Sequence, residues 1–181
     1  MLERDEYPAG VPCWVDVEQE DPEAATAFYG GLFGWEFAGS GDSTDPYFRA
    51  QLRGRDVAGI GQPAGDAPST LGWNTFIAVT SADEAAAKAK AAGGSIVAEP
   101  FDVLDAGRVA FVADPAGAVF RVWEAKGRNG AQLVNEPATW NFSELNTRDP
   151  EGAKGFYRAV FGWELRSLAP DRGDSGFWGC G

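Results

Sequence analysis

The residue types that most often carry out chemistry at neutral pH are scarce in this chain of 181 residues. It contains no histidine and only two cysteines, Cys13 and Cys180. The missing histidine excludes Ser-His-Asp and Cys-His nucleophile systems and every zinc or iron site that needs an imidazole ligand. Two cysteines at opposite ends of the sequence make neither a zinc cluster nor a disulfide framework. Any chemistry must therefore use carboxylates, Arg, Lys or Tyr, or a hard ion bound through oxygen atoms.

The charge balance narrows the classes of partner. Fifteen basic residues against 27 acidic ones give a net charge of -12, which repels phosphate groups, so we expect neither nucleic acid nor a membrane as a partner. No apolar run is long enough to span a bilayer, and residues 1–6 lack the basic and apolar regions of a secretory signal. These features predict a globular cytoplasmic protein.

The elements that would position any site include an internal repeat. Residues 21–37 and 149–165 read DPEAATAFYGGLFGWEF and DPEGAKGFYRAVFGWEL, and at a constant offset of 128 ten of their 17 positions are identical. Chance does not produce this match, so the chain contains a duplicated unit. Its second copy stops early.

Each copy of the repeat predicts one helix. Asp21 and Asp149 are N-cap residues, each followed by proline at the first helical position, and Gly34 and Gly162 end the helices. The apolar residues follow i, i+3, i+4, i+7 spacing, which predicts one face in the protein core. We therefore expect six aromatic side chains to be buried: Phe28, Tyr29, Phe33, Phe156, Tyr157 and Phe161.

The surrounding pattern predicts two βαβββ units and the start of a third. In the first unit, residues 11–62, strands 11–18, 35–38, 47–52 and 57–62 surround the repeat helix. In the second, residues 73–124, a strand over 73–80 precedes an Ala-rich helix over 82–92 and strands over 95–103, 108–113 and 118–124. A polar linker over 126–137 and a strand over 139–146 follow.

These elements and motifs resemble the vicinal oxygen chelate superfamily, which includes glyoxalase I, bleomycin-resistance proteins and extradiol dioxygenases. The resemblance rests on D-P-E-x-A-x-x-F-Y-x-x-x-F-G-W-E, on the D-P-A-G turn at 114–117, and on the segments WNTFIAV, GGSIVAEPFDV and GRVAFVADPAGAVFRVW. It implies an α+β fold in which paired βαβββ units form a curved, cup-shaped mixed sheet with helices outside. It also implies a first module over 8–125 and an incomplete second module over 138–181, as in two-module actinobacterial members.

The resemblance implies where a metal would bind. Its ligand positions fall on Trp14, on the vicinity of Asn74 and on Arg121. Trp, Asn and Arg cannot form a divalent metal site, and a slip of the alignment brings Asp16 or Glu124 closer but supplies no histidine. We therefore predict no metal ligands and no cofactor, and we assign no catalytic residue.

The same strands line the concave side of the family's cup, so the resemblance implies a ligand site there. The candidate residues are Trp14, Asp16, Trp73, Asn74, Arg121, Trp123 and Glu124. The tryptophans either line the pocket or pack in the core. Asp16 and Glu124 are most simply solvated strand carboxylates, and Arg121 is either an exterior charge or an anchor for an anionic ligand.

Three functions remain in competition. The first is a small-molecule-binding protein that holds an apolar or aromatic ligand in a metal-free cup. The second is a glyoxalase-like lyase, hydroxylase or dioxygenase that uses a divalent metal with oxygen ligands. The third is a structural module that acts through dimerisation. Because the helix over 149–161 must bury its apolar face, we also expect a homodimer with residues 139–181 in the interface.

Overall fold

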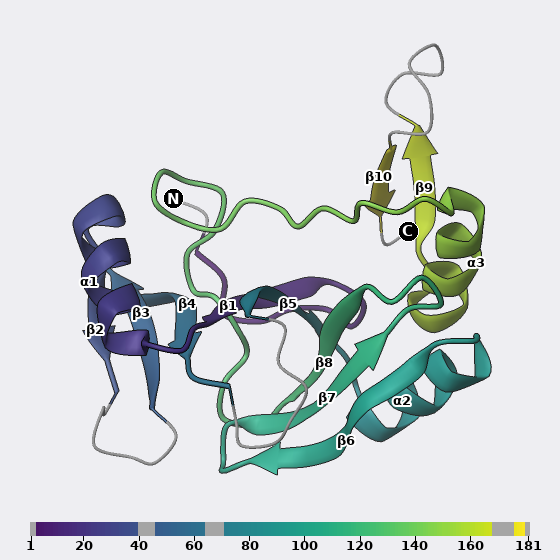
Figure 1. Ribbon diagram of the computed structural model, residues 1–181, viewed down its shortest axis with the longest axis horizontal. Helices are drawn as coiled ribbons and strands as arrows, with labels where there is room; N and C mark the ends of the chain where they lie inside the picture. Colours follow the sequence, from purple (N-terminus) through teal and green to yellow (C-terminus); the bar gives the residue numbers. More distant parts are fainter. Residues whose placement is uncertain (1–2, 40–45, 64–70, 168–175, 180–181) are drawn as a thin grey trace. The chain divides into compact units, whose positions relative to one another are not determined.

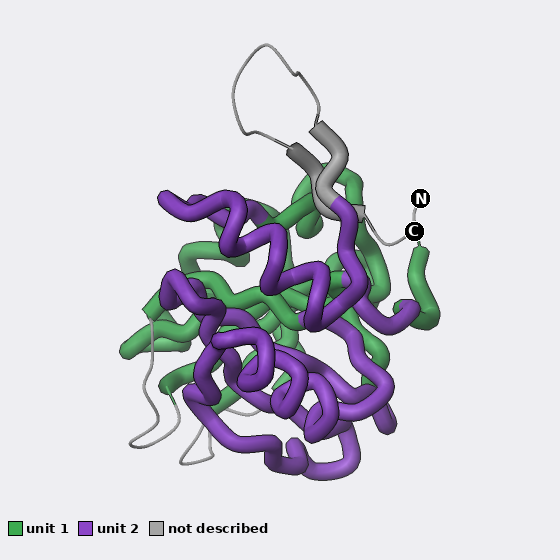
Figure 2. Tube along the Cα trace, turned by 90° about the vertical axis from the view of Figure 1, so that its right-hand side faces the viewer, with its two compact units in different colours: residues 1–7, 12–76, 128–143 green, residues 8–11, 77–127, 144–181 purple. Residues whose placement is uncertain are grey.

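The computed structural model describes residues 3–39, 46–63, 71–167 and 176–179. The chain divides into two compact units, shown in different colours in Figure 2. Unit 1 contains Met1–Tyr7, Pro12–Phe76 and Arg128–Ser143, and unit 2 contains Pro8–Val11, Ile77–Gly127 and Glu144–Gly181. No helix in the described residues is long and apolar enough to cross a membrane.

Unit 1 contains the first βαβββ series (Figure 1). Its elements are β1 (Pro12–Glu18), α1 (Pro22–Phe33), β2 (Glu36–Ala38), β3 (Tyr47–Leu52) and β4 (Arg55–Gly61). The strand order is β2-β3-β4-β1, in which β1 pairs in parallel with β4 and the other pairs are antiparallel. Val17 and Ile60 from the two parallel strands pack with Ala25 of α1, so the helix covers one face of this sheet.

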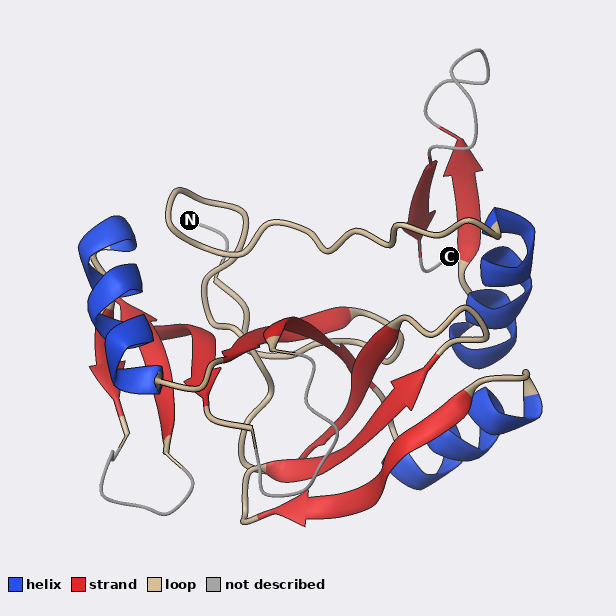
Figure 3. Ribbon diagram, in the orientation of Figure 1, coloured by secondary structure: helices blue, strands red, loops and turns tan. Residues whose placement is uncertain are grey.

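Unit 2 contains the second βαβββ series, which begins with the last residues of β5 (Gly72–Ala78), the strand divided between the units. It continues with α2 (Ala82–Ala91), β6 (Ser95–Val103), β7 (Gly107–Ala113) and β8 (Val119–Ala125). The strands β8, β7 and β6 are antiparallel neighbours, and α2 packs on all three (Figure 3). Two successive βαβββ series with mixed strand pairing confirm the predicted α+β class.

The helix ends form as the capping residues predict. The Asp21 carboxylate accepts a hydrogen bond from Ala24 N at 2.9 Å, and the Asp149 carboxylate accepts one from Gly152 N at 2.9 Å. Gly34 and Gly162 end the two helices with φ of 69° and 72°, a left-handed conformation that glycine adopts without steric cost.

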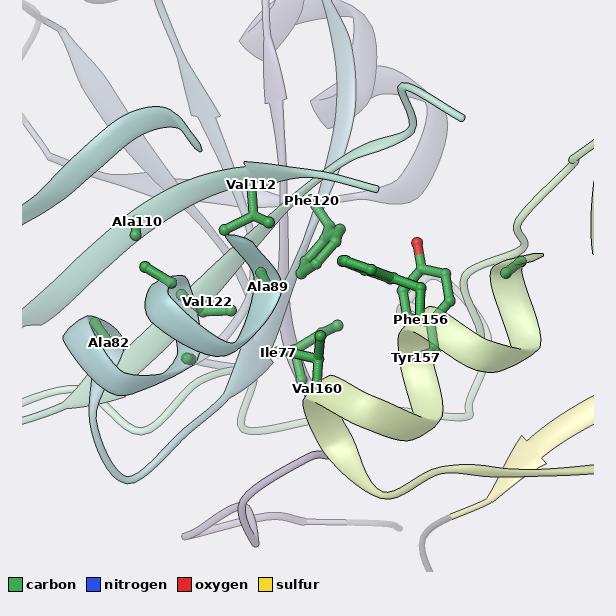
Figure 4. Packing of buried hydrophobic residues seen from close by; sticks show 13 residues of the cluster. Ile77, Ala82, Ala89, Ala110, Val112, Phe120, Val122, Phe156, Tyr157 and Val160 are labelled. Carbon is green, nitrogen blue, oxygen red and sulfur yellow. The ribbon is translucent and has the colours of Figure 1, made fainter. Parts of the chain in front are cut away.

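The second copy of the repeat, α3 (Pro150–Phe161), packs inside unit 2. Phe156, Tyr157 and Val160 point into the core formed by α2 and β8 (Figure 4). The strands β9 (Glu164–Ser167) and β10 (Gly176–Gly179) follow as an antiparallel pair. The expectation of a homodimer assumed that the apolar face of this helix needed a second chain. The same chain buries that face, so the homodimer stays a prediction without this support.

Two predicted segments differ from the structure. Residues 139–146 form no strand, because they pair with no other strand among the described residues. The predicted linker, 126–137, is not a solvated connector: Ala131, Leu133 and Val134 are buried. Arg128 in this segment donates a hydrogen bond to Asp56 at 3.2 Å, which fixes the linker to β4.

The predicted burial of the helix aromatics is confirmed for Phe156 and Tyr157, which are 2% and 6% exposed. It is wrong for Phe28 and Phe33, which are 62% and 37% exposed. Spacing alone identifies the apolar face of a helix. Whether another element covers that face depends on the tertiary structure.

Candidate functional site

A hydrogen-bonded cluster of polar side chains lies on the helix-free face of the unit 1 sheet. Asn74 Nδ2 donates to Asp16 Oδ1 at 3.0 Å, and the Tyr47 hydroxyl donates to Asp16 Oδ2 at 3.3 Å. Trp14 Nε1 donates to the Tyr47 hydroxyl oxygen at 2.9 Å. Three of these four residues, Trp14, Asp16 and Asn74, are predicted site residues, and the structure brings them together.

Side chains along β1 alternate between the two faces of the sheet, and this alternation explains why Trp14 and Asp16 lie together. Val15 and Val17 point to the α1 side and join its core, so Trp14 and Asp16 point to the opposite face. Asp16 is 2% exposed, and the two hydrogen bonds compensate for burial of its carboxylate. The expectation of a solvated carboxylate at this position is therefore wrong.

Tyr47 is not among the residues that the sequence predicted for the site. Two glycines of β4 leave the space that its side chain occupies in the cluster. A Cβ atom on Gly59 would lie 2.0 Å from the Tyr47 hydroxyl oxygen, and one on Gly61 would lie 2.9 Å from Tyr47 Cδ2. The ring therefore lies flat on a strip of sheet without side chains, where its hydroxyl reaches Asp16. The G-x-G pattern inside a strand was the available signal, because such glycines mark the close approach of another group.

The donor set of this cluster does not fit the metal centre that the family resemblance implies. Trp14 offers only an N–H donor, and the Asn74 amide nitrogen is directed at Asp16. A single carboxylate is too few ligands for a divalent ion. Within the described part of the chain, no group of three or more His, Cys, Asp or Glu side chains could hold a metal ion.

Unit 2 contains a second group of predicted residues on β8. The Arg121 guanidinium carbon lies 4.1 Å from the centre of the Phe111 ring, a cation–π contact that helps stabilise a charge only 6% exposed. Trp123 points to the same side of β8 and covers Gly107, where a Cβ atom would lie 2.4 Å from its ring. Both side chains lie on the face opposite α2. Arg121 is therefore not an exterior charge.

Two other predicted residues lie away from these clusters. Glu124 points to the α2 side of β8, where its carboxylate accepts a hydrogen bond from Ala82 N at 3.0 Å, in the first turn of that helix. The Glu124 carboxylate thus holds a helix N-terminus. Trp73 is 49% exposed, and its ring lies 5.5 Å from that of Tyr29 on α1, whereas the adjacent Asn74 points to Asp16. The structure therefore separates Trp73 from Trp14.

Cys13 is not suited to nucleophilic chemistry. Its side chain is fully buried, and burial raises the pKa of its thiol to about 12, so the thiolate does not form near pH 7. Cys180 lies outside the described residues.

An open groove of about 560 Å³ lies on the other side of unit 1, beside α1. Its lining consists of residues from the β1–α1 connection, the first turns of α1 and the residue before β5: Gln19, Glu20, Asp21, Ala24, Ala25, Phe28, Tyr29 and Leu71. None of the polar cluster residues lines this groove. It belongs to the exposed face of α1.

The sequence matches the glyoxalase/bleomycin resistance protein/dioxygenase superfamily over residues 14–122. Among curated proteins, it is 41% identical over 175 residues to "Putative glyoxylase CFP32" of Mycobacterium tuberculosis, covering 93% of this chain and 66% of that protein. It is 34% identical over 185 residues to "Anthracycline biosynthesis protein DauV" of a Streptomyces species, covering 94% and 66%. The chain thus spans about two thirds of the length of these relatives.

Solved structures agree on the fold. A Mn(II)-bound glyoxalase from Novosphingobium aromaticivorans aligns with a TM-score of 0.58 at 19% identity, covering 87% of this chain and 54% of that one. A catechol 2,3-dioxygenase aligns with a TM-score of 0.54 at 15% identity, covering 88% and 60%. From its own sequence match and this shared fold, the chain belongs to the glyoxalase/bleomycin resistance protein/dioxygenase superfamily.

Proposed function

We propose that this chain binds a small apolar or aromatic molecule on the helix-free face of unit 1, without a metal ion. The observation that carries this proposal is the hydrogen-bonded cluster of Trp14, Tyr47, Asp16 and Asn74. Tyr47 is 41% exposed and Trp14 is half-buried, so both can offer ring surface to a ligand. The buried Asp16 fixes the orientation of the Tyr47 hydroxyl and hence of both rings.

Pre-oriented aromatic rings suit a flat ligand, because stacking and buried apolar area supply affinity without ordering loose side chains at each binding event. A relative's name supports a polycyclic ligand class, since a protein 34% identical to this chain is named for anthracycline biosynthesis. In this proposal Asp16 and Asn74 are positioning residues.

The competing function is a metal-dependent glyoxalase-like or dioxygenase-like enzyme. It is favoured by the name of the mycobacterial relative and by the Mn(II)-bound structural neighbour. Such an enzyme would need oxygen ligands, for which the sequence offered Asp16 and Glu124. The two hydrogen bonds to Asp16 and the helix contact of Glu124 already engage these carboxylates.

Calorimetric titration with an anthracycline tests the proposal. We expect binding by the unmodified chain and a loss of about 1–3 kcal/mol in Trp14→Ala, the range of a buried aromatic anchor. Trp73→Ala is the matched control, because it removes an indole on the other face of the sheet and should leave the affinity unchanged.

Equal losses in the two variants would contradict the site, and no binding by the unmodified chain would contradict this ligand class. One equivalent of bound metal that survives dialysis, with a glyoxalase activity that a chelator abolishes, would instead establish the enzyme.

A further inference from the structure

The side chain of Arg49 on β3 lies on the same face of the unit 1 sheet as the proposed ligand site. Its neighbours on β3, Phe48 and Ala50, pack in the cores on the α1 side. Tyr47 and Arg49 therefore point to the opposite, helix-free face. The register agrees, because Arg49 pairs with Gly59, the glycine over which the Tyr47 hydroxyl lies. Arg49 is thus the next side chain after Tyr47 along this face.

Arg49 holds the carboxylate of Asp56 with only one of its nitrogen atoms. Arg49 Nη1 donates to Asp56 Oδ1 at 2.9 Å and to Asp56 Oδ2 at 2.8 Å. Gln51 Nε2 donates to the same Oδ1 at 2.7 Å, and Arg128 Nη1 donates to Oδ2 at 3.2 Å. A carboxylate has about four lone-pair sites, so these hydrogen bonds occupy the acceptor capacity of Asp56.

The other two nitrogen atoms of Arg49 form a second donor pair. Among the described residues, no group accepts a hydrogen bond from Arg49 Nε or Nη2. These two atoms lie side by side on one edge of the guanidinium plane, and their parallel N–H groups match the two oxygen atoms of a carboxylate. The Arg49 side chain is 27% exposed, and both of these nitrogen atoms contact solvent.

The charge of Arg49 is compensated only in part by Asp56. This carboxylate also pairs with Arg128, so its single negative charge is shared between two guanidinium groups. The net charge of the whole chain is -12, which disfavours anions over most of its surface. A guanidinium with a complete donor pair directed to solvent is therefore a local exception on an acidic protein.

We propose that the donor pair of Arg49 binds a carboxylate on the aromatic ligand, so that the ligand class of this site is a flat aromatic acid. This inference rests on the proposed function, because Trp14 and Tyr47 hold the rings of the same ligand. Successive side chains on one face of a strand are about 7 Å apart, a distance that two or three fused rings span. Asp56 and Gln51 are then positioning residues, since they fix Nη1 and leave the donor pair exposed.

Calorimetric titration with two matched probes tests this inference. An anthraquinone carboxylate and the corresponding carboxamide share one flat ring system and differ in the charge of one substituent. At neutral pH we expect the unmodified chain to bind the carboxylate at least about tenfold more tightly, because hydrogen bonds to charged groups contribute more than those to neutral ones. Trp14→Ala should weaken the binding of both probes alike.

Arg49→Lys separates the donor pair from the charge. Lysine keeps the positive charge and can still pair with Asp56, but it lacks the planar pair of N–H groups. The preference for the carboxylate should fall to about threefold or less, with the affinity for the carboxamide unchanged. Arg55→Lys is the matched control, since it makes the same replacement at a guanidinium that lies 3.5 Å from Glu3, and it should leave the preference unchanged.

If Arg49→Lys does not fold, the Nε–H proton resonance of Arg49 in the unmodified chain gives a second readout. It should move downfield when the carboxylate binds and stay in place with the carboxamide, because a charged acceptor makes the stronger hydrogen bond. An unchanged resonance with bound carboxylate would overturn the inference.

Equal affinities for the two probes, both weakened by Trp14→Ala, would overturn this inference and leave the proposed function intact. A preference for the carboxylate that persists in Arg49→Lys would overturn it as well, because another cation would then bind the acid group. If neither probe binds, the proposed function fails for flat polycyclic ligands, and the assignment of Arg49 fails with it.

Discussion

The helices α1 and α3 share ten of 17 positions with their flanking residues, begin with the same Asp-Pro cap and end at the same left-handed glycine. The aromatic packing within each copy is also alike: Trp35 lies 5.8 Å from Tyr29, and Trp163 lies 5.5 Å from Tyr157, both stacked. The copies differ in what lies beyond the helix, because α2 and Phe120 cover α3, whereas no such surface among the described residues covers Phe28 and Leu32 of α1.

This difference shows that an apolar helix face predicts packing against another surface but does not identify that surface. Apolar side chains contribute to stability only in proportion to the area that is removed from water. The same residues should therefore stabilise the fold in one copy and contribute little in the other, where they remain available for association.

The largest expected difference is in the free energy of unfolding that is lost when each of two equivalent phenylalanines is replaced. Phe156→Ala should lower the free energy of unfolding by about 3–5 kcal/mol, because it leaves a cavity beside Gly94 and Phe120. Phe28→Ala removes the same ring from an exposed position and should cost less than about 0.5 kcal/mol. Urea denaturation of both variants measures the contrast. Similar losses would mean that Phe28 is covered in the 181-residue chain.

A smaller effect is expected at alkaline pH. Burial, together with the neighbouring Asp114 carboxylate, raises the pKa of Tyr157 above its ordinary value near 10. Above that pH the tyrosine ionises in the unfolded chain but stays protonated in the folded one. The folded state then binds more protons, so stability is retained below pH 10 and lost as the pH rises toward the folded-state pKa.

This one residue should contribute a slope of up to about 1.4 kcal/mol per pH unit above pH 10. Tyr157→Phe should reduce the slope by that amount in denaturant titrations at pH 9.5 to 11, whatever its effect at neutral pH. Burial also raises the pKa of Tyr7 in unit 1 to about 12, so Tyr7 adds its own loss in both proteins. An unchanged slope in the variant would show that α3 leaves Asp114 before Tyr157 ionises.

The smallest expected effect has the opposite sign. Gly31 of α1 is equivalent to Ala159 of α3, and a Cβ atom on Gly31 would meet nothing within 4 Å. Gly31→Ala should therefore stabilise the chain by about 0.5–1 kcal/mol, since alanine loses less conformational freedom in a helix interior. A rise in thermal midpoint checks this expectation. A fall would indicate that the backbone at Gly31 lies closer to another element than the structure shows.

Local signals predicted the elements well. The N-cap aspartates and the turn at Asp114 each act within a few residues, so their hydrogen bonds follow from the sequence alone. The predicted strand over 139–146 did not form, because a strand needs a partner in space as well as an extended pattern.

The candidate site was predictable in part. Strand alternation places Trp14 and Asp16 on one face, and the same rule separates Trp73 from Asn74 and Trp123 from Glu124. The position of Tyr47 was not predictable in this way, because it depends on the pairing of β3 with β4 and on two glycines 12 and 14 residues further along the chain.

The sequence by itself determined the two βαβββ series, the duplicated helix with its caps, and the absence of every histidine-based site. Only the tertiary structure decided that Asp16 is buried with two hydrogen-bond donors, and that Phe156 and Val160 of α3 are buried whereas Phe28 and Leu32 of α1 are exposed. The physical reason is the distance along the sequence over which each kind of interaction acts. Caps, turns and alternation act over a few residues, whereas burial depends on which surfaces distant in sequence meet.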